Sequence, residues 1–117
     1  MLCALLATSL LLLATAQSSP IVTTPCGAVL GVVQPLYDSS GSVAIFRSIR
    51  YANPPTGAAR WEPPVAAACW SGTYNATVYN NYCVQSGGDG DEDCLFLTVF
   101  VPLSAQGALP PANASRT

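Results

Sequence analysis

The chain has 117 residues, with six acidic side chains, four arginines, no lysine and no histidine, and its formal net charge is −2. This balance offers no basic surface for nucleic acid or for anionic lipid. The missing histidine excludes a histidine general base within these residues and removes the commonest metal ligand. The sequence therefore predicts no nucleic-acid partner, no metal site and no cofactor, and it gives no indication of oligomeric state.

The first 16 residues, MLCALLATSLLLLATA, form an apolar run that ends in the small-residue pattern Ala14-Thr15-Ala16. This pattern predicts a cleaved secretory signal peptide, although the usual basic residue near the start is missing. The apolar part, residues 4–14, is shorter than the roughly 20 residues that a membrane-spanning helix needs. We therefore expect a secreted, extracellular chain that begins at residue 17 and has no membrane span. A buried core helix and an uncleaved membrane anchor are the less favoured alternatives.

Cysteine usage agrees with export. Four cysteines follow the signal: Cys26, Cys69, Cys83 and Cys94. An even number in an exported chain predicts two disulfides, and three connectivities are possible. A zinc site is disfavoured because the spacings fit no zinc finger and no histidine is available.

Two glycosylation sequons point to the same compartment. Asn75-Ala76-Thr77 and Asn113-Ala114-Ser115 both match the acceptor pattern. They predict N-linked glycans on Asn75 and Asn113.

Short strands and turns follow the signal. The runs CGAVLGVV, residues 26–33, and VAIFRSIRYA, residues 43–52, are both rich in β-formers and flank a segment of turn residues, 34–42. This arrangement predicts an antiparallel hairpin. Gly31 interrupts the first run, which indicates a bulge or a close backbone approach.

A proline-rich segment comes next, with two Pro-Pro pairs in residues 53–70. We expect an irregular surface loop. The alternative, a polyproline ligand for an aromatic groove, lacks a repeated motif.

An acidic segment, SGGDGDED, occupies residues 86–93. Asp89, Asp91 and Asp93 alternate as in a calcium loop, but an EF-hand would need a glycine after the third acid and a glutamate further on. A solvated loop is the favoured interpretation.

The run CLFLTVFVP, residues 94–102, has Thr98 as its one polar residue after the cysteine. Because it is apolar on both faces, it predicts a strand buried within a sheet that is covered on each side. Residues 103–117 then have a linker-like composition.

Three blocks together carry a family resemblance: residues 26–33, FRSIRYANPPTGAARWEPP (46–64), and EDCLFLTVFVP (92–102), which follows the Cys-x-Gln of residues 83–85. In this order they resemble the N-terminal region of the type-B carboxylesterase and cholinesterase family. The resemblance implies an α/β fold class, with residues 17–117 as the N-terminal part of an α/β-hydrolase domain, here mostly short strands.

The sequence departs from the family pattern at several places. The second block resembles Phe-x-Gly-Ile-Pro-Tyr-Ala-x-Pro-Pro-x-Gly-x-x-Arg-Phe, with Ser48 for the first glycine, Arg50 for the first proline and Trp61 for the final phenylalanine. The third resembles Glu-Asp-Cys-Leu-Tyr-Leu-Asn-Val, with Phe96 for the tyrosine and Thr98 for the asparagine.

The resemblance also implies structural pairs. Cys94 would close a loop with Cys83, which leaves Cys26 and Cys69 to each other, to other partners or free, because the family supplies no such bridge. Arg60 and Glu92 would form an internal ion pair. Removal of one partner of a buried pair typically costs about 3–5 kcal/mol, so Glu92→Ala is expected to impair secretion of the complete protein.

The family's chemistry is that of a serine hydrolase. A serine on a Gly-x-Ser-x-Gly elbow attacks the ester, a histidine accepts its proton, an acid orients the histidine, and backbone N–H groups hold the oxyanion. The chain has no histidine and no such elbow. We therefore expect an N-terminal fragment, a truncated gene model or a splice product that has no catalytic residue and is inactive alone.

The full-length protein would act on a small-molecule carboxylic ester. No aromatic residue lies between Cys83 and Cys94, which disfavours choline esters, since their recognition uses cation–π contact. Two alternatives stay open. One is a non-catalytic adhesion ectodomain or binding module of the same family, and the other is an unrelated secreted module held by disulfides.

Overall fold

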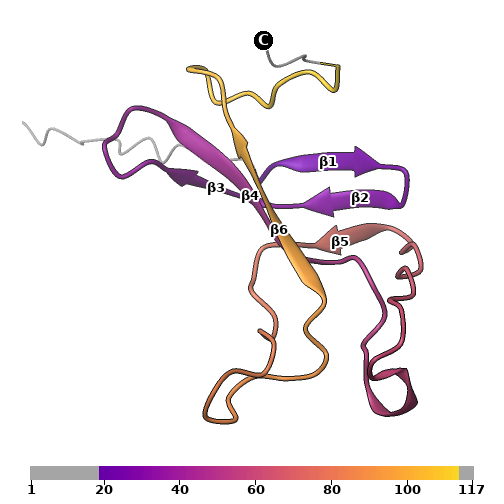
Figure 1. Cartoon of the computed structure of the whole chain (residues 1–117). Coiled ribbons are helices and arrows are strands. Elements are labelled where there is room, and N and C mark those ends of the chain that lie inside the picture. The colour runs from indigo at the N-terminus through magenta and orange to yellow at the C-terminus, as the bar shows by residue number, and fades with distance from the viewer. Residues whose placement is uncertain (1–18, 114–117) are drawn as a thin grey trace, which may run out of the picture.

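A computed structural model gives the structure of residues 19–113 (Figure 1). The strands in this part of the chain are β1 (Ile21–Thr24), β2 (Gly27–Leu30), β3 (Val32–Pro35), β4 (Ser42–Arg50), β5 (Thr73–Asn75) and β6 (Phe96–Pro102), and a short 3-10 helix, η1, spans Gly57–Ala59. They make two three-stranded sheets, ordered β1-β2-β5 and β3-β4-β6. These residues are thus mostly short strands and loops, without an α-helix. The leader expected at residues 1–16 lies outside the described part.

The first sheet has a hairpin at its start and a parallel strand at its edge. β1 and β2 are antiparallel, with Val22 opposite Val29, and β5 runs parallel to β2, with Tyr74 also opposite Val29. Val29 is 2% exposed. Gly27 opens β2 with a φ of +122°, and a Cβ there would lie 2.7 Å from Nε1 of Trp70. A glycine is needed because larger residues rarely adopt this backbone conformation.

The second sheet contains the predicted hairpin. β3 and β4 are antiparallel, with Val33 opposite Ala44. The N–H of Leu36 donates to the carbonyl of Gly41 at 2.9 Å across the turn. The prediction of a hairpin is therefore confirmed, but only the second half of the run at residues 26–33 takes part in it, because the first half belongs to the other sheet.

Gly31 marks the point where the chain passes from one sheet to the other. A Cβ at this position would lie 2.7 Å from the carbonyl oxygen of Ile45 and 2.7 Å from Cδ1 of Phe46. The predicted close backbone approach is confirmed. It allows β2 and β3 to be consecutive and yet belong to different sheets.

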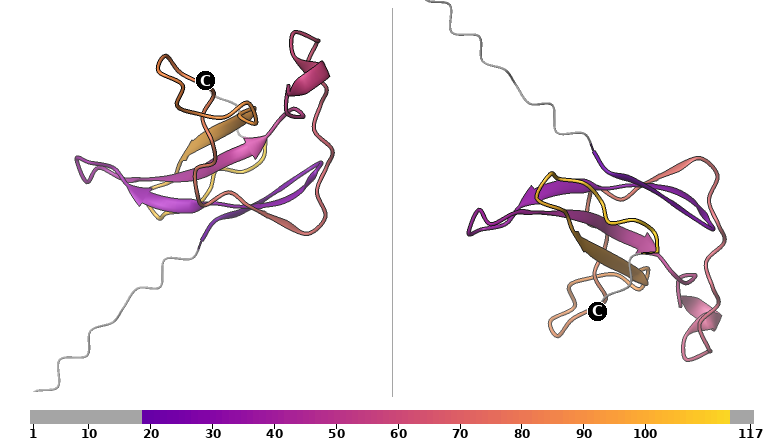
Figure 2. Two further views of the ribbon diagram at one scale, coloured as in Figure 1. Left: turned by 90° about the horizontal axis from the view of Figure 1, so that it is seen from below. Right: turned by 90° about the horizontal axis from the view of Figure 1, so that it is seen from above.

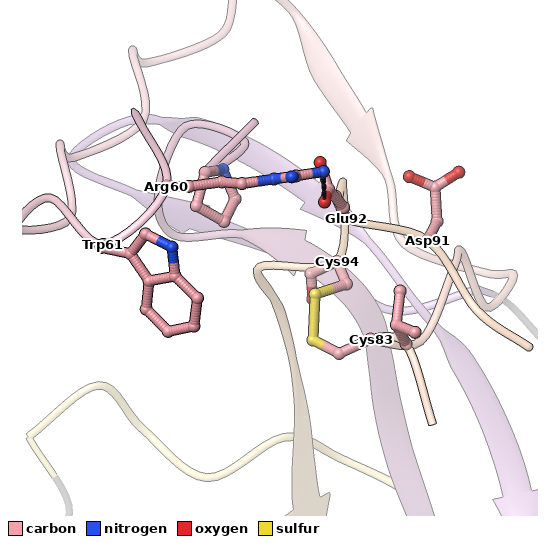
Figure 3. A pocket seen from close by; sticks show the side chains of 8 residues that line it. Arg60, Trp61, Cys83, Asp91, Glu92 and Cys94 are labelled. Carbon is pink, nitrogen blue, oxygen red and sulfur yellow. Dashed lines mark hydrogen bonds and ion pairs between the residues drawn. A yellow bond between two sulfur atoms is a disulfide. The ribbon is translucent and has the colours of Figure 1, made fainter. Parts of the chain in front are cut away.

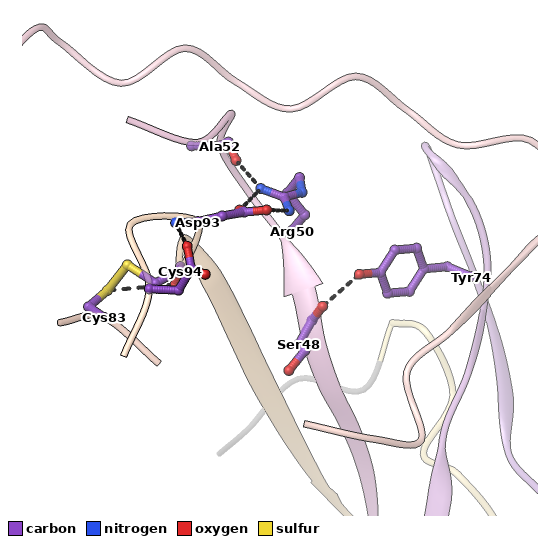
Figure 4. A network of polar contacts seen from close by, with 8 residues as sticks. Ser48, Arg50, Ala52, Tyr74, Cys83, Asp93 and Cys94 are labelled. Carbon is purple, nitrogen blue, oxygen red and sulfur yellow. Dashed lines mark hydrogen bonds and ion pairs between the residues drawn. A yellow bond between two sulfur atoms is a disulfide. The ribbon is translucent and has the colours of Figure 1, made fainter. Parts of the chain in front are cut away.

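A bulge lies in the pairing of β4 with β6. The register shifts between Phe46 and Ile49, and Ser48 has a φ of +53° and is 6% exposed. Its Oγ accepts a hydrogen bond from the N–H of Asn80 at 2.7 Å. Its carbonyl accepts one from the Tyr74 hydroxyl at 2.7 Å (Figure 4). The pattern that residues 46–52 resemble has a glycine at this position, and glycine adopts a positive φ without strain. The two hydrogen bonds hold a serine in that conformation instead.

The outer strand β6 is less buried than its composition predicts. Leu97 and Val99 are each 40% exposed and Phe100 is 57% exposed. The prediction of a strand buried on both faces is wrong for the described residues. The physical reason is that no α-helix among residues 19–113 packs over this sheet, so its faces are covered only in part.

The core is small and joins the two sheets. Its buried residues are Val29, Ala44, Phe46 and Ala76. Leu103 and Leu109, from the segment of linker-like composition, also pack against it. The long loops between β4 and β5 and between β5 and β6 project from the same end of the second sheet (Figures 1 and 2).

Candidate functional site

The acidic loop is closed at its base by a disulfide. Cys83 and Cys94 are bonded, with their Cα atoms 4.9 Å apart (Figure 3). This is the pairing that the resemblance implies. Inside the loop, the N–H of Gln85 donates to the carbonyl of Asp89 at 2.8 Å, and that of Asp91 donates to the carbonyl of Tyr82 at 2.9 Å. The loop is therefore a hydrogen-bonded turn that leaves Asp89 and Asp91 exposed.

An ion pair links this loop to the proline-rich loop. Arg60 follows η1, and its Nη2 donates to Oε1 of Glu92 (Figure 3). The structure thus brings together the two residues that the resemblance pairs. Among residues 19–113 the side chains are 56% and 37% exposed, because the loop carrying Arg60 projects from the sheet with no described layer over it. The internal placement that the resemblance implies for the complete domain stays a prediction.

A second ion pair was not predicted from the sequence. Nη1 and Nη2 of Arg50 donate to Oδ1 and Oδ2 of Asp93 at 2.6 Å and 2.9 Å (Figure 4). The guanidinium also lies 4.4 Å from the ring centroid of Phe96. Two parallel hydrogen bonds make this the stronger arrangement of the two pairs. Two features of the sequence could have indicated this pair: Arg50 stands where the family pattern has a proline, and Asp93 directly precedes Cys94.

The Arg50 contact shifts the ionisation of Asp93. Hydrogen bonding from Arg50 lowers the pKa of the Asp93 carboxyl, and the same hydrogen bond raises the pKa of Arg50. A carboxyl whose pKa is lower in the folded chain contributes stability above its unfolded pKa, which is about 3.9. That contribution is lost as the pH falls through the folded pKa.

We predict that a double-mutant cycle will detect a stabilising coupling free energy between Arg50 and Asp93. Arg50→Met, Asp93→Asn and the double variant should give a coupling free energy of about 1 kcal/mol at pH 7, at the upper end for partly exposed pairs. Urea unfolding at pH 7 and below pH 4 provides the measurement, and the coupling should decline on acidification.

The matched control is the cycle of Arg60→Met with Glu92→Gln, because that pair is single and Arg60 is more exposed. We expect a smaller coupling there, a few tenths of a kcal/mol. An Arg60–Glu92 coupling larger than the Arg50–Asp93 coupling would contradict the assignment.

The two loops and the disulfide border a hollow of about 490 Å³. Its lining comprises Pro55, Arg60, Trp61, Cys83, Val84, Asp91, Glu92 and Cys94 (Figure 3). None of these is a serine, and the only cysteines are joined to each other. The lining therefore offers no nucleophile with a partnering base. Its polar groups serve to hold the loops together.

The alternating aspartates do not converge on a common point. Oδ1 of Asp91 accepts a hydrogen bond from the N–H of Asp93 at 2.7 Å, and the Asp93 carboxylate faces Arg50. Across residues 19–113, no group of three or more His, Cys, Asp or Glu side chains is arranged to hold a metal ion. The same residues include no helix long and apolar enough to cross a bilayer.

The other two cysteines form a second bridge. Cys26 and Cys69 are bonded, with Cα atoms 4.6 Å apart and a sequence separation of 43. Beside this bridge, Nε1 of Trp70 donates to the carbonyl of Ala28 at 2.9 Å, and its ring centroid lies 5.0 Å from that of Tyr74. The bridge and the tryptophan together fasten the proline-rich segment to the first sheet.

The two sequons are placed differently. Asn75 is exposed at the end of β5. Asn113 is exposed and is the last described residue, so Ser115 of its sequon lies outside the described part.

Comparisons with known proteins agree with these features. The model of the carboxylesterase family matches residues 18–114. The chain is similar to liver carboxylesterase 1F of Rattus norvegicus, with 34% identity over 104 residues, 74% of this chain and 18% of that protein. It is similar to liver carboxylesterase 1 of Oryctolagus cuniculus, with 33% identity over 114 residues, 80% of this chain and 20% of that protein.

The match to liver carboxylesterase of Sus scrofa is of the same kind, with 34% identity over 113 residues, 80% of this chain and 20% of that protein. The chain thus spans about a fifth of the length of the curated relatives that it matches. The family model covers most of the chain, including both sheets and both disulfides. The chain belongs to the carboxylesterase family.

Proposed function

We propose that this chain is the N-terminal segment of a secreted carboxylic ester hydrolase with an α/β-hydrolase fold and a serine nucleophile. The observation that carries the proposal is the family match over residues 18–114. The apolar leader pattern and the two disulfides support export, because disulfides persist in oxidising compartments. Small-molecule carboxylic esters are the substrates proposed for the full-length protein.

The segment's own contribution would be structural. Its two sheets meet in one core, and the acidic and proline-rich loops are held by a disulfide and two ion pairs. The chain contains no histidine and no Gly-x-Ser-x-Gly motif. We therefore assign it no catalytic residue, and the nucleophile, the base and the oxyanion hole would come from the remainder of the full-length protein.

The test is ester hydrolysis by two products of the same gene. In the presence of the 117-residue chain, we expect a chromogenic short-chain ester to be hydrolysed no faster than it is without protein. The longest product, if it contains a Gly-x-Ser-x-Gly elbow and a histidine, should hydrolyse the ester, and replacement of the elbow serine by alanine should abolish turnover. Turnover by the purified 117-residue chain would refute the assignment.

The same experiment addresses the alternative function. If the longest product of the gene is folded and secreted but hydrolyses no ester, the result would support the alternative that the protein is a non-catalytic adhesion ectodomain. Export is read separately, from the presence of the protein in the culture medium.

A further inference from the structure

Asp89, in the acidic loop that projects away from both sheets (Figure 1), differs from the other aspartates in having a free carboxylate. Oδ1 of Asp38 accepts hydrogen bonds from the N–H and the hydroxyl of Ser40 at 3.0 Å and 2.6 Å. Asp93 is held by an ion pair, and Oδ1 of Asp91 accepts a hydrogen bond from the N–H of Asp93. Asp89 is exposed, and within residues 19–113 its carboxylate accepts no hydrogen bond.

The residue after Asp89 is a glycine that the loop requires. Gly90 has a φ of +108°, and a Cβ there would lie 2.7 Å from the carbonyl oxygen of Cys83 and 2.8 Å from Cα of Val84. Residues with a Cβ also rarely adopt this backbone conformation. Within residues 19–113, the N–H of Gly90 makes no backbone hydrogen bond. The loop therefore places an unshielded amide nitrogen directly after a free carboxylate.

We propose that Asp89 is a site of spontaneous isomerisation, in which its peptide bond to Gly90 migrates from the main chain to the side chain. In the first step a bond forms between the Gly90 nitrogen and Cγ of Asp89, and the bond from Cγ to one carboxyl oxygen breaks. That oxygen leaves as water with the carboxyl proton and the amide proton, and a cyclic succinimide remains. Water then adds to the former backbone carbonyl carbon, and the bond from that carbon to the nitrogen breaks. The product, isoaspartate, has the composition and the charge of the original residue.

Hydrogen bonding makes the other aspartates less reactive. The oxygen leaves as water only from a protonated carboxyl, and a hydrogen bond to the charged form of a carboxyl favours that form. The side-chain hydrogen bond from Ser40 lowers the pKa of Asp38, and the hydrogen bond from Arg50 lowers the pKa of Asp93. The residues that follow the other three aspartates are Ser39, Glu92 and Cys94. Each of these has a side chain that crowds the attacking nitrogen.

Isomerisation would release the hydrogen bonds that shape the acidic loop. The carbonyl of Asp89 accepts from the N–H of Gln85 at 2.8 Å, and in the product this carbonyl belongs to a free carboxylate outside the main chain. The main chain also gains a methylene, which displaces the N–H of Asp91 from the carbonyl of Tyr82. The disulfide still closes the base of the loop. The modified loop would thus stay attached but lose its internal hydrogen bonds.

The site is tested by storage of the purified 117-residue chain in neutral buffer at body temperature over several weeks. Isoaspartate is counted by methyl transfer from S-adenosylmethionine with a protein isoaspartyl methyltransferase, and peptide mapping locates it. We expect severalfold more isoaspartate at Asp89 than at any other aspartate. The variant Asp89→Glu keeps the charge but would need a larger ring, so its loop should stay unmodified. An isoaspartate content at Asp89 no higher than at Asp38 or Asp91 would overturn the proposal, which depends on neither export nor ester hydrolysis.

A matched variant separates the effect of the structure from that of the Asp-Gly sequence. Ser39→Gly creates a second Asp-Gly pair in an exposed turn, and Ser39 already has a φ of +58°, which glycine adopts without strain. Because Ser40 holds the Asp38 carboxylate, we expect isoaspartate to form severalfold more slowly at Asp38 of this variant than at Asp89. Equal rates would overturn the role assigned to the free carboxylate.

Hydrogen exchange tests the consequence for the loop. In the stored chain, the N–H groups of Gln85 and Asp91 should lose protection relative to the fresh chain. The N–H of Arg47, which donates to the carbonyl of Ala76 in the core, should keep its protection. Unchanged protection of Gln85 and Asp91 in a chain that carries isoaspartate would overturn the expected loss of order.

Discussion

Replacing Cys26 and Cys69 together by alanine is expected to lower the free energy of unfolding by about 4 kcal/mol. The bridge spans 43 residues, and the loss of chain entropy on cross-linking grows with the length of the closed loop. Natural domains have only about 5–15 kcal/mol of net stability, so the effect is large. Urea unfolding followed by tryptophan fluorescence provides the measurement, since Trp70 lies next to Cys69.

The matched control is the double replacement of Cys83 and Cys94, whose separation is 11 residues. The shorter loop predicts a smaller loss, about 3 kcal/mol on the same loop-entropy relation. If removal of the short bridge destabilised the chain more than removal of the long one, loop entropy would not be the dominant contribution.

Gly31→Ala is expected to destabilise the chain by about 3 kcal/mol, and Gly31→Val by more. The added Cβ would lie 2.7 Å from the backbone oxygen of Ile45, which cannot rotate away, and 2.7 Å from the Phe46 ring in the core. Overpacking of this kind forces backbone shifts that typically cost about 1–3 kcal/mol. The midpoint of urea unfolding measures the change.

Gly41→Ala is the control, because a Cβ at Gly41 meets only Cδ1 of Leu36, at 3.9 Å, an ordinary contact. We expect a change within about 0.5 kcal/mol there, as for other surface substitutions. A Gly31→Ala variant as stable as the Gly41→Ala variant would contradict the close approach between the sheets.

Local patterns predicted part of this fold well. The alternation in residues 43–52 and the turn residues before it predicted the β3–β4 hairpin, and a glycine inside an apolar run predicted the close approach at Gly31. Both depend on neighbours along the chain. In contrast, β1 and β5 are only four and three residues long, which is too short for periodicity to show. The parallel pairing of β5 with β2 also depends on contacts between distant segments.

The burial of β6 shows a different limit. Its apolar composition indicates a strand covered on both faces, but the exposure of a side chain depends on which segments pack against it. Within residues 19–113, Val101 packs against the core, whereas Leu97, Val99 and Phe100 stay partly exposed. The same holds for Arg60 and Glu92, whose pairing follows from the family pattern while their exposure does not.

The residues that fasten the loops were predictable only in part. The family pattern implied the Cys83–Cys94 bridge, whereas residue spacing alone left three connectivities open. The Arg50–Asp93 pair was missed because its partners are 43 residues apart and no family motif contains them both. Ser48 was seen as a departure from the pattern, but its role at the bulge needed the positions of Tyr74 and Asn80.

The most direct test of the structural role is covalent labelling by a fluorophosphonate, which phosphonylates serines that a neighbouring base activates. We predict that the intact mass of the 117-residue chain stays unchanged after incubation, because no histidine or elbow serine is present. A serine esterase labelled in the same tube confirms that the reagent is active. A stoichiometric adduct on any serine of this chain would contradict the assignment of the chain as a scaffold without catalytic residues.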